Sequence, residues 1–146
     1  MRFMIIRKAD ANTEGDDKPT EELVKAMMAY HEEMIRAGVM LGGDGLQPSR
    51  KGARLEFRKG KPTVIDGPFS EAKELIAGYT LINVKSREEA IEWAKRWPAV
   101  DGDGEVQLEL RQLYEVDDFG PEFSPAIRKQ EELLQEVQGK PGASLS

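Results

Sequence analysis

Short blocks of apolar residues separated by polar turns predict a series of strands in this chain. Phe3–Ile6 is a continuous apolar run, which is typical of a strand buried on both faces. Val106–Arg111 alternates apolar and polar side chains with a period of two and is the clearest strand pattern. Val39–Leu41 and Tyr79–Val84 are also expected to be strands. The glycines of Gly42–Gly45 predict a bulge or a close approach by another group.

Three other segments repeat apolar residues at helical spacing. A helix is expected to follow Thr20 and to end at Gly38, because residues near 100° apart form one apolar stripe. A second helix begins with a capping box at Ser86 and stops at Pro98. Pro125–Val137 is a third candidate helix. The stripe of the first helix consists of Leu23, Met27, Tyr30, His31 and Met34.

A hairpin is predicted between these elements. Leu55–Phe57 and Thr63–Ile65 read as two strands joined at Lys59-Gly60. Its basic side chains can discourage strand pairing at a solvated edge, and this explains them at least as well as anion binding does. The basic residues are Arg54, Arg58, Lys59 and Lys61.

The hairpin leads into a turn that is the most informative segment of the chain. Its second strand delivers Asp66 to Gly67-Pro68, a strong turn signal. Ser70 is expected to cap a short helical stretch that Gly78 closes. A carboxylate at such a corner either serves a site or hydrogen-bonds the backbone amides of its own turn.

The order of these elements predicts an α+β fold of ferredoxin-like architecture, with the hairpin inserted and a helix added at the C-terminus. Two helices cover one face of the sheet, which leaves Met4, Ile6 and either Thr80 or Tyr79 beside Gln107, Glu109 and Arg111 on the other. A second copy of the sheet is the simplest cover for that face. We expect a domain over residues 1–118, a helical extension over 119–138 and a disordered tail over 139–146.

Several of these segments together resemble the YciI-like (YCII-related) family and its DGPF proteins. The resemblance covers roughly residues 1–118 and implies a dimeric α+β barrel with clefts between helix, sheet and partner. It also implies a His–Asp pair, but most members of the family lack an established activity. The matching segments are Met1–Ile6, Tyr30–Met34, Ala37–Val39, Leu41–Leu46, Asp66–Glu74 and Glu88–Ala94, with Trp97-Pro98 after them.

Composition narrows the classes of function. The chain has 146 residues with a net charge of −6 and no long basic run, which argues against nucleic-acid binding. It has no cysteine, so disulfides, thiolate chemistry and thiolate metal sites are excluded. No apolar run is long enough for a membrane span, and no signal peptide is evident, so a cytoplasmic location without membrane contact is expected.

His31 is the only histidine and the first candidate for acid–base chemistry, because the imidazole pKa of about 6.5 suits proton transfer near neutrality. The alternative is a structural histidine at the edge of the core. Asp66 and Asp44 are the two candidates to orient it, and Tyr79 and Arg111 the candidates to position a substrate. No metal site and no cofactor are expected, since one histidine with scattered carboxylates makes a poor ligand set.

Two hypotheses follow from the sequence. The first is a small homodimeric enzyme that uses His/Asp acid–base chemistry on a small organic molecule. The second is a non-catalytic homodimer that binds a metabolite in the same cleft, with the Asp66–Phe69 turn serving the architecture. The sequence does not identify the substrate under either hypothesis.

Overall fold

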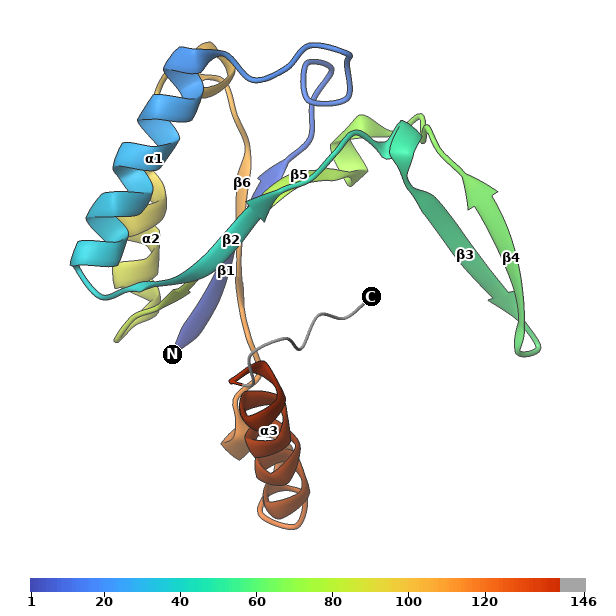
Figure 1. Ribbon diagram of the computed structural model, residues 1–146, viewed down its shortest axis with the longest axis vertical. Coiled ribbons are helices and arrows are strands. Elements are labelled where there is room, and N and C mark those ends of the chain that lie inside the picture. The colour runs from blue at the N-terminus through green and yellow to red at the C-terminus, as the bar shows by residue number, and fades with distance from the viewer. Residues whose placement is uncertain (140–146) are drawn as a thin grey trace. The chain divides into compact units, whose positions relative to one another are not determined.

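A computed structural model describes residues 1–139 of the chain and shows an α+β fold (Figure 1). The strands are β1 (Arg2–Lys8), β2 (Met40–Gly45), β3 (Ala53–Arg58), β4 (Lys61–Asp66), β5 (Ile76–Asn83) and β6 (Leu108–Gln112). The helices are α1 (Glu21–Arg36), α2 (Arg87–Lys95) and α3 (Ser124–Gln138). Short 3-10 turns lie at Ser49–Lys51, Ala72–Glu74, Asp101–Gly104 and Val116–Phe119.

The chain divides into two compact units, Met1–Gln112 and Leu113–Ser146. The second unit contains α3 and the 3-10 turn at Val116–Phe119, with the rings of Tyr114 and Phe119 at 5.2 Å between centroids. The sequence placed a boundary after residue 118, within this unit. Of the expected tail at 139–146, residues 140–146 lie outside the described part of the chain.

Four antiparallel strands form the sheet of the first unit, in the order β2-β5-β1-β6. Side chains of β1 alternate, with Phe3 and Ile5 buried on one face and Met4 and Ile6 only partly covered on the other. Ile5 pairs with Thr80 of β5 and with Leu110 of β6. The apolar run at the N-terminus is therefore the centre of the sheet, with one face in the core.

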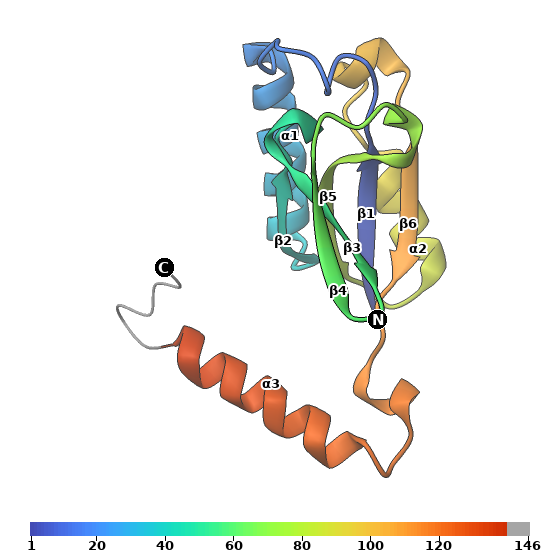
Figure 2. The same cartoon turned by 90° about the vertical axis from the view of Figure 1, so that its right-hand side faces the viewer.

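Helices α1 and α2 cover that core face, and no described helix of this unit covers the other face (Figures 1 and 2). Thr20 caps α1 by accepting from the Leu23 amide, and Ser86 caps α2 in the same way at Glu89. Tyr30 and Met34 are the buried residues of α1, as the apolar stripe predicted. His31 lies beside that stripe and is half-buried.

The predicted irregularity in the glycine-rich strand is confirmed. The register of β2 shifts between Met40 and Gly42 where it pairs with β5. A Cβ on Gly43 would lie 2.6 Å from the Tyr79 carbonyl oxygen, so only glycine lets the two strands approach this closely.

The predicted hairpin is present, and a short helical turn follows it, but the ends expected for that turn at Ser70 and Gly78 are wrong. Strands β3 and β4 pair from Ala53↔Asp66 to Arg58↔Lys61. Between them and β5 the chain forms only the 3-10 turn at Ala72–Glu74. Gly78 closes no helix, because it lies within β5, where it pairs with both Gly45 and Arg7. Pairing on both edges of β5 overrides the local glycine signal.

Candidate functional site

The uncovered face of the sheet gathers most of the candidate site residues. In the register of the sheet, Asp44 of β2 pairs with Tyr79 of β5, and Met4 of β1 pairs with both Leu81 and Arg111. Successive strand residues point to opposite faces, so the partners of a half-covered residue share its face. The open face therefore carries Met4, Ile6, Gly42, Asp44, Tyr79, Leu81, Glu109 and Arg111.

Asp44 and Tyr79 form the polar pair of this face. The Tyr79 hydroxyl donates to Oδ2 of Asp44 at 3.0 Å. This hydrogen bond, together with the charge of the Asp44 carboxylate, raises the pKa of Tyr79 above its ordinary value. The phenol stays protonated at neutral pH, and its single proton is donated to Asp44, so a ligand can receive this hydrogen bond only by displacing Asp44.

Arg111 adds a positive charge to the open face. Its Nη1 lies 3.4 Å from Oε2 of Glu109, and 71% of its side chain is exposed. An ion pair this exposed is weak, so the guanidinium is available to a negatively charged group. The apolar floor between Arg111 and Asp44 is provided by Met4, Ile6 and Leu81.

His31 lies away from this group, on α1, which packs on the opposite face of the sheet. It lines a groove of about 590 Å³ between α1 and β2, with Met28, Ile35 and Met40 among the other lining residues. Burial lowers the pKa of His31 below 6.5, so the imidazole is neutral at pH 7. Within residues 1–139 the ring contacts Tyr30 but forms no hydrogen bond or ion pair.

Asp66 ends β4 and is exposed. Its side chain makes no polar contact in the described part of the chain, so it hydrogen-bonds neither its own turn nor His31. The structure thus places Asp44, Tyr79 and Arg111 on one face, where Tyr79 contacts Asp44 while Arg111 lies on the opposite edge strand of the sheet. It does not bring His31 to either aspartate.

The turn after Asp66 has a clear structural role at the base of the hairpin. The Gly67 amide donates to the Gly52 carbonyl at 3.0 Å, and the Phe69 amide donates to Oγ of Ser49 at 3.0 Å. Oγ of Ser49 in turn donates to Glu14 at 2.6 Å. A Cβ on Gly67 would overlap the Ser49 carbonyl oxygen, so this position requires glycine. These hydrogen bonds therefore attach the base of the hairpin to the loop that contains Glu14.

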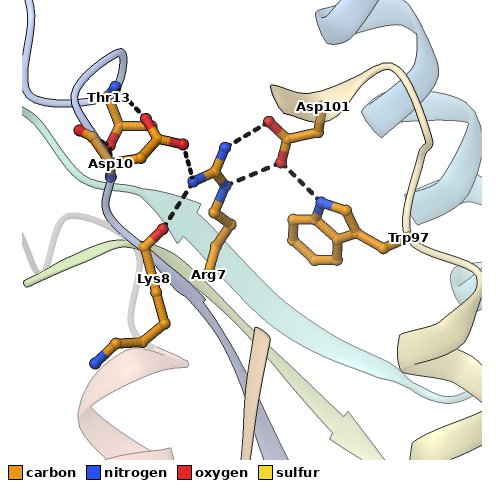
Figure 3. A network of polar contacts seen from close by, with 6 residues as sticks. All are labelled: Arg7, Lys8, Asp10, Thr13, Trp97 and Asp101. Atoms are coloured by element: carbon orange, nitrogen blue, oxygen red, sulfur yellow. Dashed lines mark hydrogen bonds and ion pairs between the residues drawn. The ribbon is translucent and has the colours of Figure 1, made fainter. Parts of the chain in front are cut away.

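Sequence reasoning missed a buried polar network around Arg7 (Figure 3). The Arg7 guanidinium donates to both carboxylate oxygens of Asp101, at 3.0 and 2.8 Å, and to Asp10 at 2.8 Å. Nε1 of Trp97 donates to the same Asp101 carboxylate at 2.8 Å. Arg7 and Asp101 are both 6% exposed. The sequence feature that could have indicated this network is Arg7, because it continues the alternation that places Phe3 and Ile5 on the core face.

The hydrogen bonds of this network determine its charge state. Burial alone would raise the pKa of Asp101, but donation by Arg7 and Trp97 outweighs it, and the pKa is lowered. The hydrogen bond to Asp101 raises the pKa of Arg7. Both groups are charged and fully paired, which fits a structural link between β1 and the loop after α2.

The described residues contain no cluster suited to a metal ion and no helix suited to span a membrane. Among residues 1–139, no three histidine or carboxylate side chains are grouped closely enough to hold a metal ion. The helices in that range are also too short or too polar to cross a membrane.

Comparison with known proteins assigns this chain to a protein family. Residues 1–113 match the YCII-related domain. An uncharacterized protein of Rhizobium meliloti (strain 1021) is 32% identical over 75 residues, which are 51% of this chain and 60% of that protein. The chain thus spans less than two thirds of the length of this curated relative.

A solved structure can also be compared. It is 5-chloro-2-hydroxyhydroquinone dehydrochlorinase from Burkholderia phenoliruptrix AC1100, in complex with 2,5-dihydroxybenzoquinone. The similarity covers 79% of this chain and 95% of that chain, with 15% identity and a TM-score of 0.39. This likeness is too distant to say anything about the chemistry of the present chain. The domain match spans most of the chain, which therefore belongs to the YCII-related family.

Proposed function

We propose that this chain is the ferredoxin-like subunit of a homodimer, a dimeric α+β barrel, that binds a small organic molecule between its two open sheet faces. The observation that carries the proposal is the Asp44–Tyr79 hydrogen bond on the same uncovered face as Arg111. Polar groups gathered over an apolar floor are typical of small-molecule sites once the floor is covered.

The apolar floor supports the dimer. Burying a large aliphatic side chain is worth roughly 1.5–3 kcal/mol, and Met4, Ile6 and Leu81 remain only partly covered in the single chain. A second sheet packed face to face would bury these residues in both copies. It would also enclose the polar groups, where hydrogen bonds and charges act more strongly than they do in water.

The polar groups indicate the chemistry of the ligand. Arg111 suits a carboxylate or another anionic oxygen group, because its planar guanidinium donates in a fork. Asp44 offers a carboxylate acceptor, and the Tyr79 hydroxyl can donate to a ligand once the ligand displaces its hydrogen bond to Asp44. We therefore propose a small organic acid as the ligand class.

The same groups permit general acid–base catalysis. Asp44 is the proposed base, and the Tyr79 phenol is the proposed proton donor to the bound molecule. His31, the proton-transfer group expected from the sequence, lies beside a groove on the other side of the sheet and takes no part in this proposed pair. A catalytic role for His31 would need a carboxylate from outside its described contacts.

The test measures binding and turnover on one panel of small aromatic and aliphatic carboxylates. Calorimetry should find a ligand whose affinity falls at least tenfold in Arg111→Gln, since the guanidinium is its main charge partner. Glu105→Gln, an exposed change outside the site, should leave affinity unchanged. If affinity for every ligand found is the same in Arg111→Gln and Tyr79→Phe as in the natural chain, the open-face site is wrong.

Two further variants separate enzyme from binding protein. In an enzyme of the proposed kind, Asp44→Asn abolishes turnover but retains ligand affinity within a few fold, whereas His31→Gln retains both. Loss of turnover in His31→Gln alone would favour the groove as the catalytic site. Binding without turnover in any form, the natural chain included, would favour the non-catalytic metabolite-binding homodimer.

A further inference from the structure

The β3–β4 hairpin presents an unusual apolar face to solvent. Leu55 pairs with Val64 and Phe57 pairs with Pro62, so these four residues lie on one face of the two-stranded ribbon. Leu55, Phe57 and Val64 are 57%, 64% and 62% exposed. Every residue of both strands is exposed.

Such a hairpin needs a partner surface to be stable. An isolated two-stranded hairpin is marginal in water, and stability normally requires a third strand or packing against another element. The described chain provides that packing only at the base, where Ser49, Gly52 and Glu14 hold the turn. The arm beyond the base extends away from the sheet on the side opposite α1 and α2 (Figures 1 and 2).

A matching unfilled surface lies on the other side of the same unit. The groove between α1 and β2 has an apolar lining that includes Met28, Ile35 and Met40. Met28 is 66% exposed and Ile35 is 62% exposed. Because the arm and this groove lie on opposite sides of the sheet, the arm cannot cover the groove of its own chain.

Charge complementarity points to a second copy as the occupant. The hairpin Ala53–Asp66 contains four basic and two acidic residues and is positive, whereas the whole chain carries −6. Helix α1, which forms one wall of the groove, contains four acidic and two basic residues. A positive arm on a negative body favours attachment of the arm to another copy of that body.

We propose that the β3–β4 hairpin is a dimer arm that packs its apolar face into the α1–β2 groove of a second copy. The proposal rests on the homodimer proposed above, and adds a contact that the open sheet faces do not require. In a twofold-symmetric pair each chain donates one arm and receives one, so both exposed apolar surfaces are covered in both copies. The arm also closes the groove that holds His31.

The absence of cysteine from the chain gives a clean test by crosslinking. A tagged Phe57→Cys chain is mixed with an untagged Met28→Cys chain at micromolar concentration, and a short bismaleimide is added. We expect a covalent species that joins one tagged and one untagged chain. Val64→Cys serves as a second arm variant in case Phe57→Cys folds poorly.

Glu56→Cys is the matched control, because Glu56 lies on the same strand but on the opposite face from Phe57. The tagged–untagged yield with Met28→Cys should be at least fivefold lower for Glu56→Cys than for Phe57→Cys. Equal yields, or Phe57→Cys chains that crosslink mainly to one another, would overturn the proposal. So would binding of the natural chain to phosphatidylserine vesicles that is lost in Phe57→Ser, since lipid would then cover the arm.

Sedimentation of the same samples separates this proposal from the sheet-face dimer. A dimer of the natural chain that gives no Phe57–Met28 crosslink overturns the arm and leaves the sheet-face dimer standing. A crosslink that persists in a Leu81→Lys background at full yield supports the arm and counts against the sheet faces. A monomeric natural chain overturns both.

Discussion

The most constrained residues of the first unit are the two buried charges Arg7 and Asp101. Their side chains are 7% and 9% exposed and are joined at 2.8 Å. A buried charge is tolerated only when it is paired and hydrogen-bonded, and Trp97 and Asp10 complete that requirement. Sequence reasoning did not single out Arg7, and no local pattern could identify its partner, because Asp101 lies in a loop 94 residues away.

Asp101→Asn should destabilise the fold by about 3 kcal/mol, because it leaves the Arg7 guanidinium buried with a neutral partner. Chemical denaturation measures this, with the exposed Glu105→Gln as a control that should change stability little. The lowered pKa of Asp101 also predicts a pH dependence. The ionised Asp101 carboxylate adds its full contribution to folding stability above the ordinary carboxyl pKa of 3.8. That contribution is lost as the pH falls through the lower folded-state pKa of Asp101.

Acid titration of the variant therefore adds a second readout. Asp101→Asn should remove part of the stability loss that the natural chain shows below pH 4. A variant as stable as the natural chain at pH 7 would mean that the Arg7–Asp101 pair contributes nothing net to folding.

Among the elements, the strands and the hairpin could be predicted from local patterns, but their junctions could not. The two-residue alternation of Val106–Arg111 predicted a strand, which the structure has at Leu108–Gln112, and the Lys59-Gly60 turn joins β3 to β4 as expected. The segment after Ser70 did not follow its local signals. Ser70 and Gly78 suggested helix ends, yet β5 begins at Ile76 because it pairs with β1 and β2 on its two edges.

The candidate site shows the same limit. Alternation placed Arg111 on the open face, and its pairing with Met4 agrees. The sequence left Thr80 and Tyr79 as alternatives there, and the structure buries Thr80 and leaves Tyr79 half-covered. The pairing of Asp44 with Tyr79 depends on the register shift between Met40 and Gly42, which no local pattern reveals. His31 follows the helical stripe, but a helical wheel does not show which side chains a groove brings beside it.

Gly67→Ala tests the junction between hairpin and body. The added methyl group would meet the Ser49 carbonyl, and overpacking of this kind costs roughly 1–3 kcal/mol. We expect a loss of stability in that range by thermal or urea denaturation. Gly45→Ala is the control, since nothing lies within 4 Å of its Cβ and the change should have little effect. Equal stability of the two variants would show that the Asp66–Phe69 turn does not hold the hairpin.

At the scale of the whole molecule, the single chain leaves two kinds of apolar surface in contact with water. One is the open sheet face with Met4, Ile6 and Leu81, and the other is the hairpin face with Leu55 and Phe57. Neither surface has a cover among the described residues of the first unit. The length and charge of the sequence could not predict which of these surfaces a partner contacts.

Sedimentation equilibrium at micromolar concentration tests whether two copies pack through their open sheet faces. We expect about twice the 16.4 kDa chain mass for the natural protein. Leu81→Lys should give a folded chain whose mass shifts toward the monomer, since it places a charge at the centre of the interface. Leu133→Lys, the same change on an exposed residue of α3, should remain dimeric. A monomeric natural chain, or a dimer that Leu133→Lys disrupts and Leu81→Lys does not, would rule out packing through the open sheet faces.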